Sequence, residues 1–338
     1  MNITWKFYDL KLKDAFGISR GTRTVVPSVI ISIGDGRSVG YGEATVNPYY
    51  GTSIASFDTE LKGVQGELEA FGSGTPEEFD VLLDQCLGEQ MFLKCALGQA
   101  FLDCYCRSHG MTSREFFNYP TRRNLISSYT IGLDTVPEMI RKVRQTPWPI
   151  YKIKLGAGYE KDLEILSALR KETSAIFRID VNGGWSLEQA LRAQNHLKDL
   201  GVEFIEQPLH ADAREDMKRL YEQALLPMIA DESCLIFDDI VGCHGYFHGV
   251  NIKLMKCGGM LAADRMIQKA KSLDMQVMMG CMTESSIGIS AIAQFVSELD
   301  YVDMDGAMLL KNDPAYGVEV KKSAVVFPQT LGNGGGLF

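Results

Sequence analysis

The sequence predicts an α/β protein, namely a modified TIM barrel of the (β/α)7β type with an N-terminal α+β capping domain. From residue 126 onward, strand-like runs alternate with amphipathic helical stretches. Charged residues end five of these strands at intervals of roughly 25 residues, which is about the length of a βα unit in a parallel barrel. The chain has 338 residues, more than the roughly 250 of a barrel alone, so a second module is expected.

The first third of the chain has the pattern of the capping domain, which we predict over residues 1–120. Residues 3–11 and 25–34 are strand-like, and the Asp35-Gly36 turn continues the second run as a hairpin. Apolar residues at helical spacing follow at 54–70, 76–87 and 91–108. Strands followed by helices indicate a compact α+β module.

The barrel is predicted over residues 125–310, after a polar, proline-containing connection at 118–124. Its eight strand candidates are 127–132, 151–155, 176–181, 204–208, 227–233, 249–255, 276–280 and 301–306. The segment between residues 233 and 249 is too short for a full helix. The strand-like and then Gly-rich tail, 311–338, is expected to pack back on the capping domain.

The composition argues against several classes of function. A net charge of −9 and the lack of a basic run argue against nucleic-acid binding. The N-terminus lacks a signal-peptide hydrophobic region, and no run approaches the roughly 18 apolar residues of a membrane span. Eight scattered cysteines indicate reduced thiols rather than a disulfide framework. We therefore expect a cytoplasmic protein with a small-molecule substrate; a homo-oligomer is one alternative that the sequence leaves open.

Three carboxylates stand at predicted strand ends, in the strings IDVN, EQP and DES. They are Asp180, Glu206 and Asp231, and no cysteine or histidine accompanies them. Oxygen ligands of this kind favour Mg²⁺. Any one of them alone could be a helix cap. Three at regular strand spacing predict a Mg²⁺ site at one end of the barrel.

Lysines flank the carboxylates along the chain. In KIK, Lys152 and Lys154 lie two residues apart and so face the same side of a strand. Crowding and burial of these ammonium groups predict a lowered lysine pKa, suited to a base. In NIKLMK, strand parity points Lys253 inward and Lys256 away. A metal between two lysines suits proton abstraction beside a carboxylate, through an enediolate whose charge the metal neutralises.

The strings KxK, DxN, EQP, ADES and IKxxxxGG, in this order, resemble the muconate-lactonizing-enzyme subgroup of the enolase superfamily. The resemblance spans nearly the whole chain, including the capping module and the tail. It implies that Lys154 and Lys253 are the paired acid/base catalysts and that Lys152 modulates Lys154. It also implies that the three carboxylates hold Mg²⁺, with Asn182 placed behind them.

The last predicted strand, YVDMDG, presents Asp303 and Asp305 on one face. Paired inward acids need a compensating cation, which a substrate ammonium group or a barrel lysine or arginine could supply. The motif resembles that of dipeptide epimerases of the L-Ala-D/L-Glu type. That resemblance implies an isomerase that binds the α-ammonium of a dipeptide here and inverts the α-carbon of its C-terminal residue by 1,1-proton transfer.

Two loops of the capping domain, 17–23 and 46–53, are expected to close the site, mainly by the same resemblance. Glu284, after the seventh strand, could be a pocket wall or an ordinary first-turn helix residue. The remaining candidate substrate-binding residues are Arg20, Arg23, Tyr50 and Thr130.

Two other functions stay open from the sequence. A cycloisomerase or o-succinylbenzoate synthase-type lyase could use the same scaffold and would need no partner for an ammonium group. A non-catalytic ligand-binding barrel is an alternative of a different class.

Overall fold

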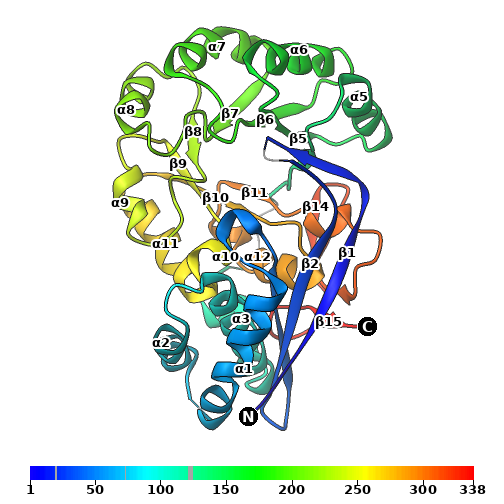
Figure 1. The fold of residues 1–338 in the computed structure, drawn as a ribbon, viewed down its shortest axis with the longest axis vertical. Coiled ribbons are helices and arrows are strands. Elements are labelled where there is room, and N and C mark those ends of the chain that lie inside the picture. The colour runs from blue at the N-terminus through cyan, green and yellow to red at the C-terminus, as the bar shows by residue number, and fades with distance from the viewer. Residues whose placement is uncertain (20, 73, 121–124) are drawn as a thin grey trace.

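Eight parallel strands form the barrel (Figure 1). The structure is a computed structural model that describes residues 1–19, 21–72, 74–120 and 125–338. The strands are β4 (Tyr129–Ile131), β5 (Ile150–Lys154), β6 (Ile176–Asp180), β7 (Val202–Glu206), β8 (Met228–Ala230), β9 (Gly249–Ile252), β10 (Gln276–Gly280) and β11 (Tyr301–Asp303). Each pairs with the next along the chain, and a parallel bridge from Ser127 to Val302 closes the ring. The predicted fold class is confirmed.

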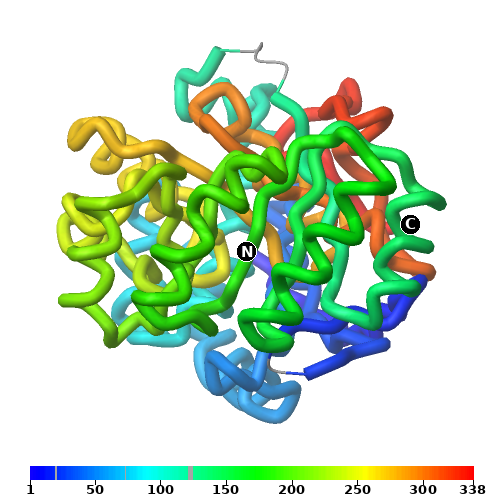
Figure 2. Tube along the Cα trace, turned by 90° about the horizontal axis from the view of Figure 1, so that it is seen from above, coloured from blue at the N-terminus to red at the C-terminus, as the bar shows by residue number. Residues whose placement is uncertain are grey.

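Helices connect successive barrel strands and cover them on the outside. They are α5 (Val136–Gln145), α6 (Tyr159–Arg170), α7 (Leu187–Asp199), α8 (Arg214–Glu222), α9 (Asp239–Cys243), α10 (Leu254–Cys257), α11 (Met260–Ser272) and α12 (Ser286–Ala293). The green helices of the first half of the barrel lie side by side in Figure 2. A capping box starts α7, in which Ser186 and Gln189 each accept a backbone N–H from the other. As expected from its length, the β8–β9 segment holds only a five-residue helix.

The capping domain packs a three-stranded antiparallel sheet against helices. The sheet has the order β1 (Asn2–Ile18), β2 (Gly21–Gly34), β3 (Val39–Thr45), and the helices are α1 (Ile54–Ala70), α2 (Pro76–Leu87), α3 (Met91–Ser108) and α4 (Ser113–Phe116). The buried helix α3 crosses β3 very closely, because a Cβ at Gly42 would lie 1.9 Å from the carbonyl oxygen of Ala96. Only glycine allows this contact.

The β1–β2 hairpin is longer than the sequence pattern predicts, and it extends along the barrel (Figure 1). A register shift between Lys11 and Phe16 interrupts the alternation of polar and apolar residues, which is why the predicted first strand ended too early. Near the hairpin tip, the backbone N–H of Leu133 donates to Gly17 at 2.8 Å. The hairpin therefore reaches the mouth of the barrel.

The tail after β11 lies against the capping domain. Its first residues pair with β1 through a hydrogen bond from Lys311 N–H to the carbonyl of Lys11, 2.7 Å long. Near the C-terminus, the Asn333 N–H donates to Asp103 on α3 at 2.6 Å. Both chain ends lie at the capping end of the molecule (Figure 1). Within the described ranges, no helix combines the length and the apolar character needed to cross a membrane.

Candidate active site

Three buried carboxylates converge at the carboxyl end of the barrel strands. Asp180 and Glu206 end β6 and β7, and Asp231 directly follows β8. One oxygen of each lies within 4.8 Å of the others. Burial and the neighbouring Asp180 raise the pKa of Glu206 to about 7, against the opposing effect of Lys152. So dense a set of oxygen donors fits a hard divalent cation such as Mg²⁺, which would relieve this repulsion.

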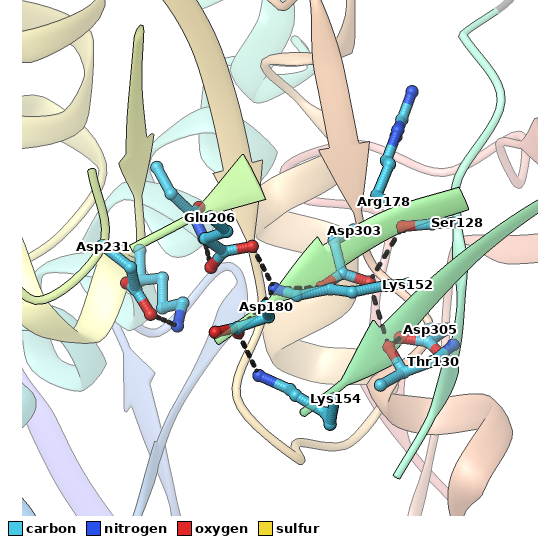
Figure 3. Close-up of polar contacts among 12 residues, drawn as sticks. Ser128, Thr130, Lys152, Lys154, Arg178, Asp180, Glu206, Asp231, Asp303 and Asp305 are labelled. Carbon is cyan, nitrogen blue, oxygen red and sulfur yellow. Dashed lines mark hydrogen bonds and ion pairs between the residues drawn. The ribbon is translucent and has the colours of Figure 1, made fainter. Parts of the chain in front are cut away.

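Lys152 lies in the middle of this group, between the carboxylate triad and the last barrel strand (Figure 3). Its Nζ is 2.7 Å from Glu206 Oε2, 3.0 Å from Asp303 Oδ2 and 3.6 Å from Asp180 Oδ2. The side chain is almost fully buried. Lys152 therefore forms ion pairs with both acidic parts of the site, through Glu206 of the triad and Asp303 of the last strand.

Lys154 and Lys253 face each other across the barrel. Lys154 Nζ donates to Asp180 Oδ2 at 2.5 Å, and Lys253 Nζ donates to Asp231 Oδ2 at 2.7 Å. Lys154 ends β5 and Lys253 directly follows β9, and these two strands are separated by three strands in either direction around the eight-stranded ring. Two ammonium groups are thus placed on opposite sides of the same space, each held by a candidate metal ligand.

The lowered pKa expected for a lysine of the KIK string is wrong for Lys152, and the pKa of Lys253 is raised as well. Burial alone would lower both values, but the carboxylates around each ammonium group outweigh it. Glu206 and Asp303 raise the pKa of Lys152 well above its usual range, and Asp231 raises that of Lys253. The crowding of two lysines is visible in the sequence, whereas the acids that face Lys152 and Lys253 come from other strands.

The expectation that Lys256 points away from the site is also wrong. Its buried Nζ donates to Asp231 Oδ1 at 2.6 Å, and to the backbone carbonyls of Asp231, Cys234 and Asn251 at 2.7, 2.9 and 3.2 Å. Strand parity does not apply to Lys256, because β9 ends at Ile252 and the chain turns into α10. The burial of Asp231 favours a higher pKa, but Lys253 and Lys256 hold that pKa well below its usual range.

We expect Lys256→Met to destabilise the protein by about 3–5 kcal/mol, since Asp231 Oδ1 and three backbone carbonyls lose the buried ammonium group that donates to them. Urea unfolding measures the change. Lys271→Met is the control, because it removes a half-exposed ion pair with Glu298 and should cost about 1 kcal/mol or less. Equal losses in the two variants would contradict the structural role of Lys256.

Asp303 and Asp305 form an acidic pair beside Thr130. The Thr130 N–H donates to Asp305 Oδ2 at 2.6 Å, and its hydroxyl lies 3.1 Å from Asp305 Oδ1 and 3.3 Å from Asp303 Oδ1. Both acids are buried, which favours a raised pKa. At Asp303, the nearby Lys152 outweighs burial and lowers the pKa. At Asp305, the neighbouring Asp303 adds to the effect of burial and raises the pKa further. The barrel lysine that the sequence left open as a partner is therefore Lys152, at least for Asp303.

A single cavity of about 130 Å³ joins the lysines, Asp231 and the acidic pair. Arg23 and Tyr50 line it, and the Arg23 guanidinium donates to Asn47 Oδ1 at 3.4 Å. Asn182 also lines it and donates to Glu232 at 3.3 Å. Arg20 lies outside the described residues.

Glu284 does not line this cavity. It is buried, and its Oε1 accepts the N–H of Met282 at 2.8 Å. The structure thus places Glu284 in the loop after β10, behind the cavity wall formed by Cys281, Met282 and Thr283.

Sequence reasoning missed an apolar wall of the cavity. Phe16, Ile18 and Val26 of the β1–β2 hairpin line it, together with Leu309 from the tail side of β11. These residues come from parts of the chain about 290 positions apart. No local pattern could reveal their meeting, because it depends on how far the hairpin extends over the barrel.

Comparisons with known proteins agree with this geometry. Residues 135–335 match the model of the enolase C-terminal domain-like family. The chain is 45% identical to the L-Ala-D/L-amino acid epimerase of Flavobacterium johnsoniae, over 99% of both chains. It is 46% identical to a protein of the same name from a Maribacter species, over 99% of this chain and 98% of that one.

Solved structures of dipeptide epimerases have the same fold. A substrate-liganded L-Ala-D/L-Glu epimerase from Bacillus subtilis matches with a TM-score of 0.91 and 25% identity, over 99% of this chain and 98% of that one. The Cytophaga hutchinsonii dipeptide epimerase, complexed with Mg and D-Ala-L-Val, matches with a TM-score of 0.90 and 26% identity, over 100% and 96%. The chain therefore belongs to the enolase superfamily and, within it, to the family that contains these dipeptide epimerases.

Proposed function

We propose that this protein is a Mg²⁺-dependent dipeptide epimerase that inverts the α-carbon of the C-terminal residue of its substrate. The observation that carries the proposal is the placement of Lys154 and Lys253 on opposite sides of one cavity, which Asp231 of the carboxylate triad and the acidic pair also line. Inversion by two acid/base groups needs one group on each side of the α-carbon, because a proton leaves one face of this carbon and a proton is added to the other.

Each part of the substrate has a complementary part of the cavity. The triad would hold Mg²⁺, which when bound supplies positive charge to the substrate carboxylate and so makes the neighbouring α-proton more acidic. Lys154 and Lys253 then act as base and acid in one direction and exchange these roles in the other. A cation on the triad would also offset the carboxylate charges that raise the pKa of Lys253.

The acidic pair favours a dipeptide over the substrates of a cycloisomerase or an o-succinylbenzoate synthase-type lyase. Asp303 and Asp305 lie in the cavity at the end of β11, away from the triad but linked to it through Lys152. A substrate α-ammonium group supplies the cation that two buried acids need. A carboxylate substrate without an amine would leave Asp305 without such a partner.

We expect Asp303→Asn to lower kcat/KM for dipeptides by about 30- to 1000-fold, the equivalent of about 2–4 kcal/mol for the loss of a buried charge pair. Blocking the substrate amine tests the same contact from the other side. An N-acetyl dipeptide should be a poor substrate for the wild type, while Asp303→Asn should discriminate little between the free and the blocked dipeptide. Equal discrimination by both proteins would contradict the assignment of the ammonium site.

The function itself is tested with a panel of L-Ala-L-X dipeptides and Mg²⁺. The expected result is conversion to L-Ala-D-X, measured by chiral chromatography of the hydrolysed product. The alanine should keep its configuration. No conversion of any dipeptide in a panel that covers acidic, basic, polar and apolar X would overturn the proposal, and would favour a ligand-binding barrel.

The described cysteines, eight in number, are all free thiols, in line with the expectation of reduced cysteines. The cytoplasmic location and a homo-oligomeric state stay predictions. Sedimentation of the purified protein measures the latter directly.

A further inference from the structure

Glu43, on capping strand β3, reaches into the barrel domain and binds the start of helix α12. Its carboxyl oxygens accept the N–H of Ser285 at 3.0 and 3.1 Å, the hydroxyl of Ser285 at 2.5 Å and the N–H of Gly288 at 3.3 Å. The hydroxyl of Ser28 on β2 donates to it at 2.7 Å. Ser285 is 242 residues away along the chain, so this contact joins the two domains.

The first turn of α12 depends on such side chains. The initial N–H groups of a helix have no partner within the helix. Glu43 accepts two of them, from Ser285 and Gly288, while Asp313 of the tail accepts that of Ser286 at 3.1 Å. The Ser285 hydroxyl accepts that of Ile287 at 3.2 Å. The position of this turn is therefore set mainly by acids from outside the barrel.

Two parts of the cavity lining lie next in sequence to the partners of this contact. Thr45, Val46 and Asn47 form one wall, which begins two residues after Glu43. The residues 281–283 form the other, which ends two residues before Ser285. Because both walls continue from the two partners of this contact, its geometry fixes the spacing between them.

The chemistry of Glu43 also sets it apart from an ordinary packing residue. The side chain is fully buried. Within the described residues, the hydrogen bonds that it accepts come from hydroxyl and amide groups rather than from lysine or arginine. A buried acid with only neutral partners costs free energy that an apolar residue would not.

We infer that Glu43 is a positioning residue for the reaction, which holds the wall 281–283 against the capping sheet and so keeps the cavity in its productive shape. The inference rests on the proposed epimerase function. Glu43 lies outside the cavity lining, so it acts through the position of the wall and leaves the carboxylate triad at the ends of β6, β7 and β8 untouched.

The test compares Glu43→Ala with Glu43→Gln. Glu43→Ala is expected to lower kcat/KM about 100-fold, since displacement of a wall by about 1 Å can have this effect. Glu43→Gln should recover most of the loss, because one amide oxygen can still accept from Ser285 and Gly288 while the NH₂ group donates to Ser28. Mg²⁺ affinity, measured by calorimetry, should stay within about twofold of the wild type in both, because the triad does not move.

Asp103→Ala is the matched control. Asp103 is equally buried and joins α3 to β3 and the tail, through Tyr41 and Asn333, without touching the wall. It should lose stability but keep kcat/KM. Amide hydrogen exchange should rise in peptides 44–47 and 281–288 of Glu43→Ala and in neither peptide of Asp103→Ala.

These readouts separate the inference from the proposed function. An inactive wild type would refute the epimerase, yet the exchange pattern would still test the positioning role. Unchanged kinetics and unchanged exchange in Glu43→Ala would overturn the inference. If Glu43→Ala does not fold, Ser285→Ala removes part of the same contact, and it should show a smaller loss of kcat/KM and a smaller rise in hydrogen exchange. Wild-type kinetics and exchange in Ser285→Ala would then overturn the inference.

Discussion

Replacing Lys154 or Lys253 with alanine is expected to lower the rate of inversion by about 10³-fold or more, which is within the range for loss of a general acid or base. Each variant should nevertheless still remove the α-proton from one of the two C-terminal enantiomers. The remaining lysine still faces one side of the α-carbon, so it can exchange the proton of one C-terminal enantiomer with solvent but cannot invert it.

The measurement uses ¹H NMR in D₂O, with separate samples of L-Ala-L-X and L-Ala-D-X. Lys154→Ala and Lys253→Ala should each exchange one of the two, and the two variants should choose opposite enantiomers. Lys161→Ala, which removes an exposed lysine paired with Glu164 on α6, serves as the control and should behave as the wild type. Inversion by the double variant, or exchange of the same enantiomer by both single variants, would refute the two-base assignment.

Removing Mg²⁺ is expected to have an effect at least as large. Dialysis against EDTA should reduce inversion to background, and added Mg²⁺ should restore it, because the triad would hold the cation that stabilises the charge developing on the substrate carboxylate. Mg²⁺ should also raise the melting temperature of the wild type, as any ligand of the native state does.

Glu206→Gln separates this site from general salt effects. The variant should lose both the activity and most of the thermal shift on adding Mg²⁺, since it keeps the shape of the side chain but removes a charged ligand. Asp216→Asn, on the exposed side of α8, should retain both. A full thermal shift in Glu206→Gln would show that Mg²⁺ binds elsewhere.

The barrel and its carboxylate triad could be predicted from the sequence because both depend on local regularities. The length of a βα unit sets the spacing between Asp180, Glu206 and Asp231, and parallel strands bring their carboxyl ends to one edge. Strand alternation also predicted that Asp303 and Asp305 lie together, and they do, although β11 ends at Asp303 and Asp305 precedes a short 3-10 helix. These rules hold wherever the chain is regular.

The parts that could not be predicted are those where the regular pattern ends or where distant segments meet. Lys256 lies one turn beyond β9, in α10, so strand parity gave the wrong direction. The apolar wall depends on a hairpin that continues past the irregularity after Lys11. The role of Glu43 could not be predicted from the sequence, because its partners on α12 lie 242 and 245 residues away.

The prediction of a lowered lysine pKa was wrong for a related reason. A pKa depends on every charge within a few ångströms, and Lys152 has three carboxylates within 3.6 Å, which come from three different strands. The sequence shows only the neighbouring lysine.

Deuterium incorporation by the wild-type enzyme tests the central claim most directly. Incubation of an L-Ala-L-X substrate with Mg²⁺ in D₂O is expected to place one deuteron on the α-carbon of the C-terminal residue, in step with formation of the D epimer, and none on the alanine. Deuterium on the N-terminal residue, or inversion without incorporation from solvent, would contradict an inversion in which one of Lys154 and Lys253 removes the α-proton and the other delivers a solvent-derived deuteron to the opposite face.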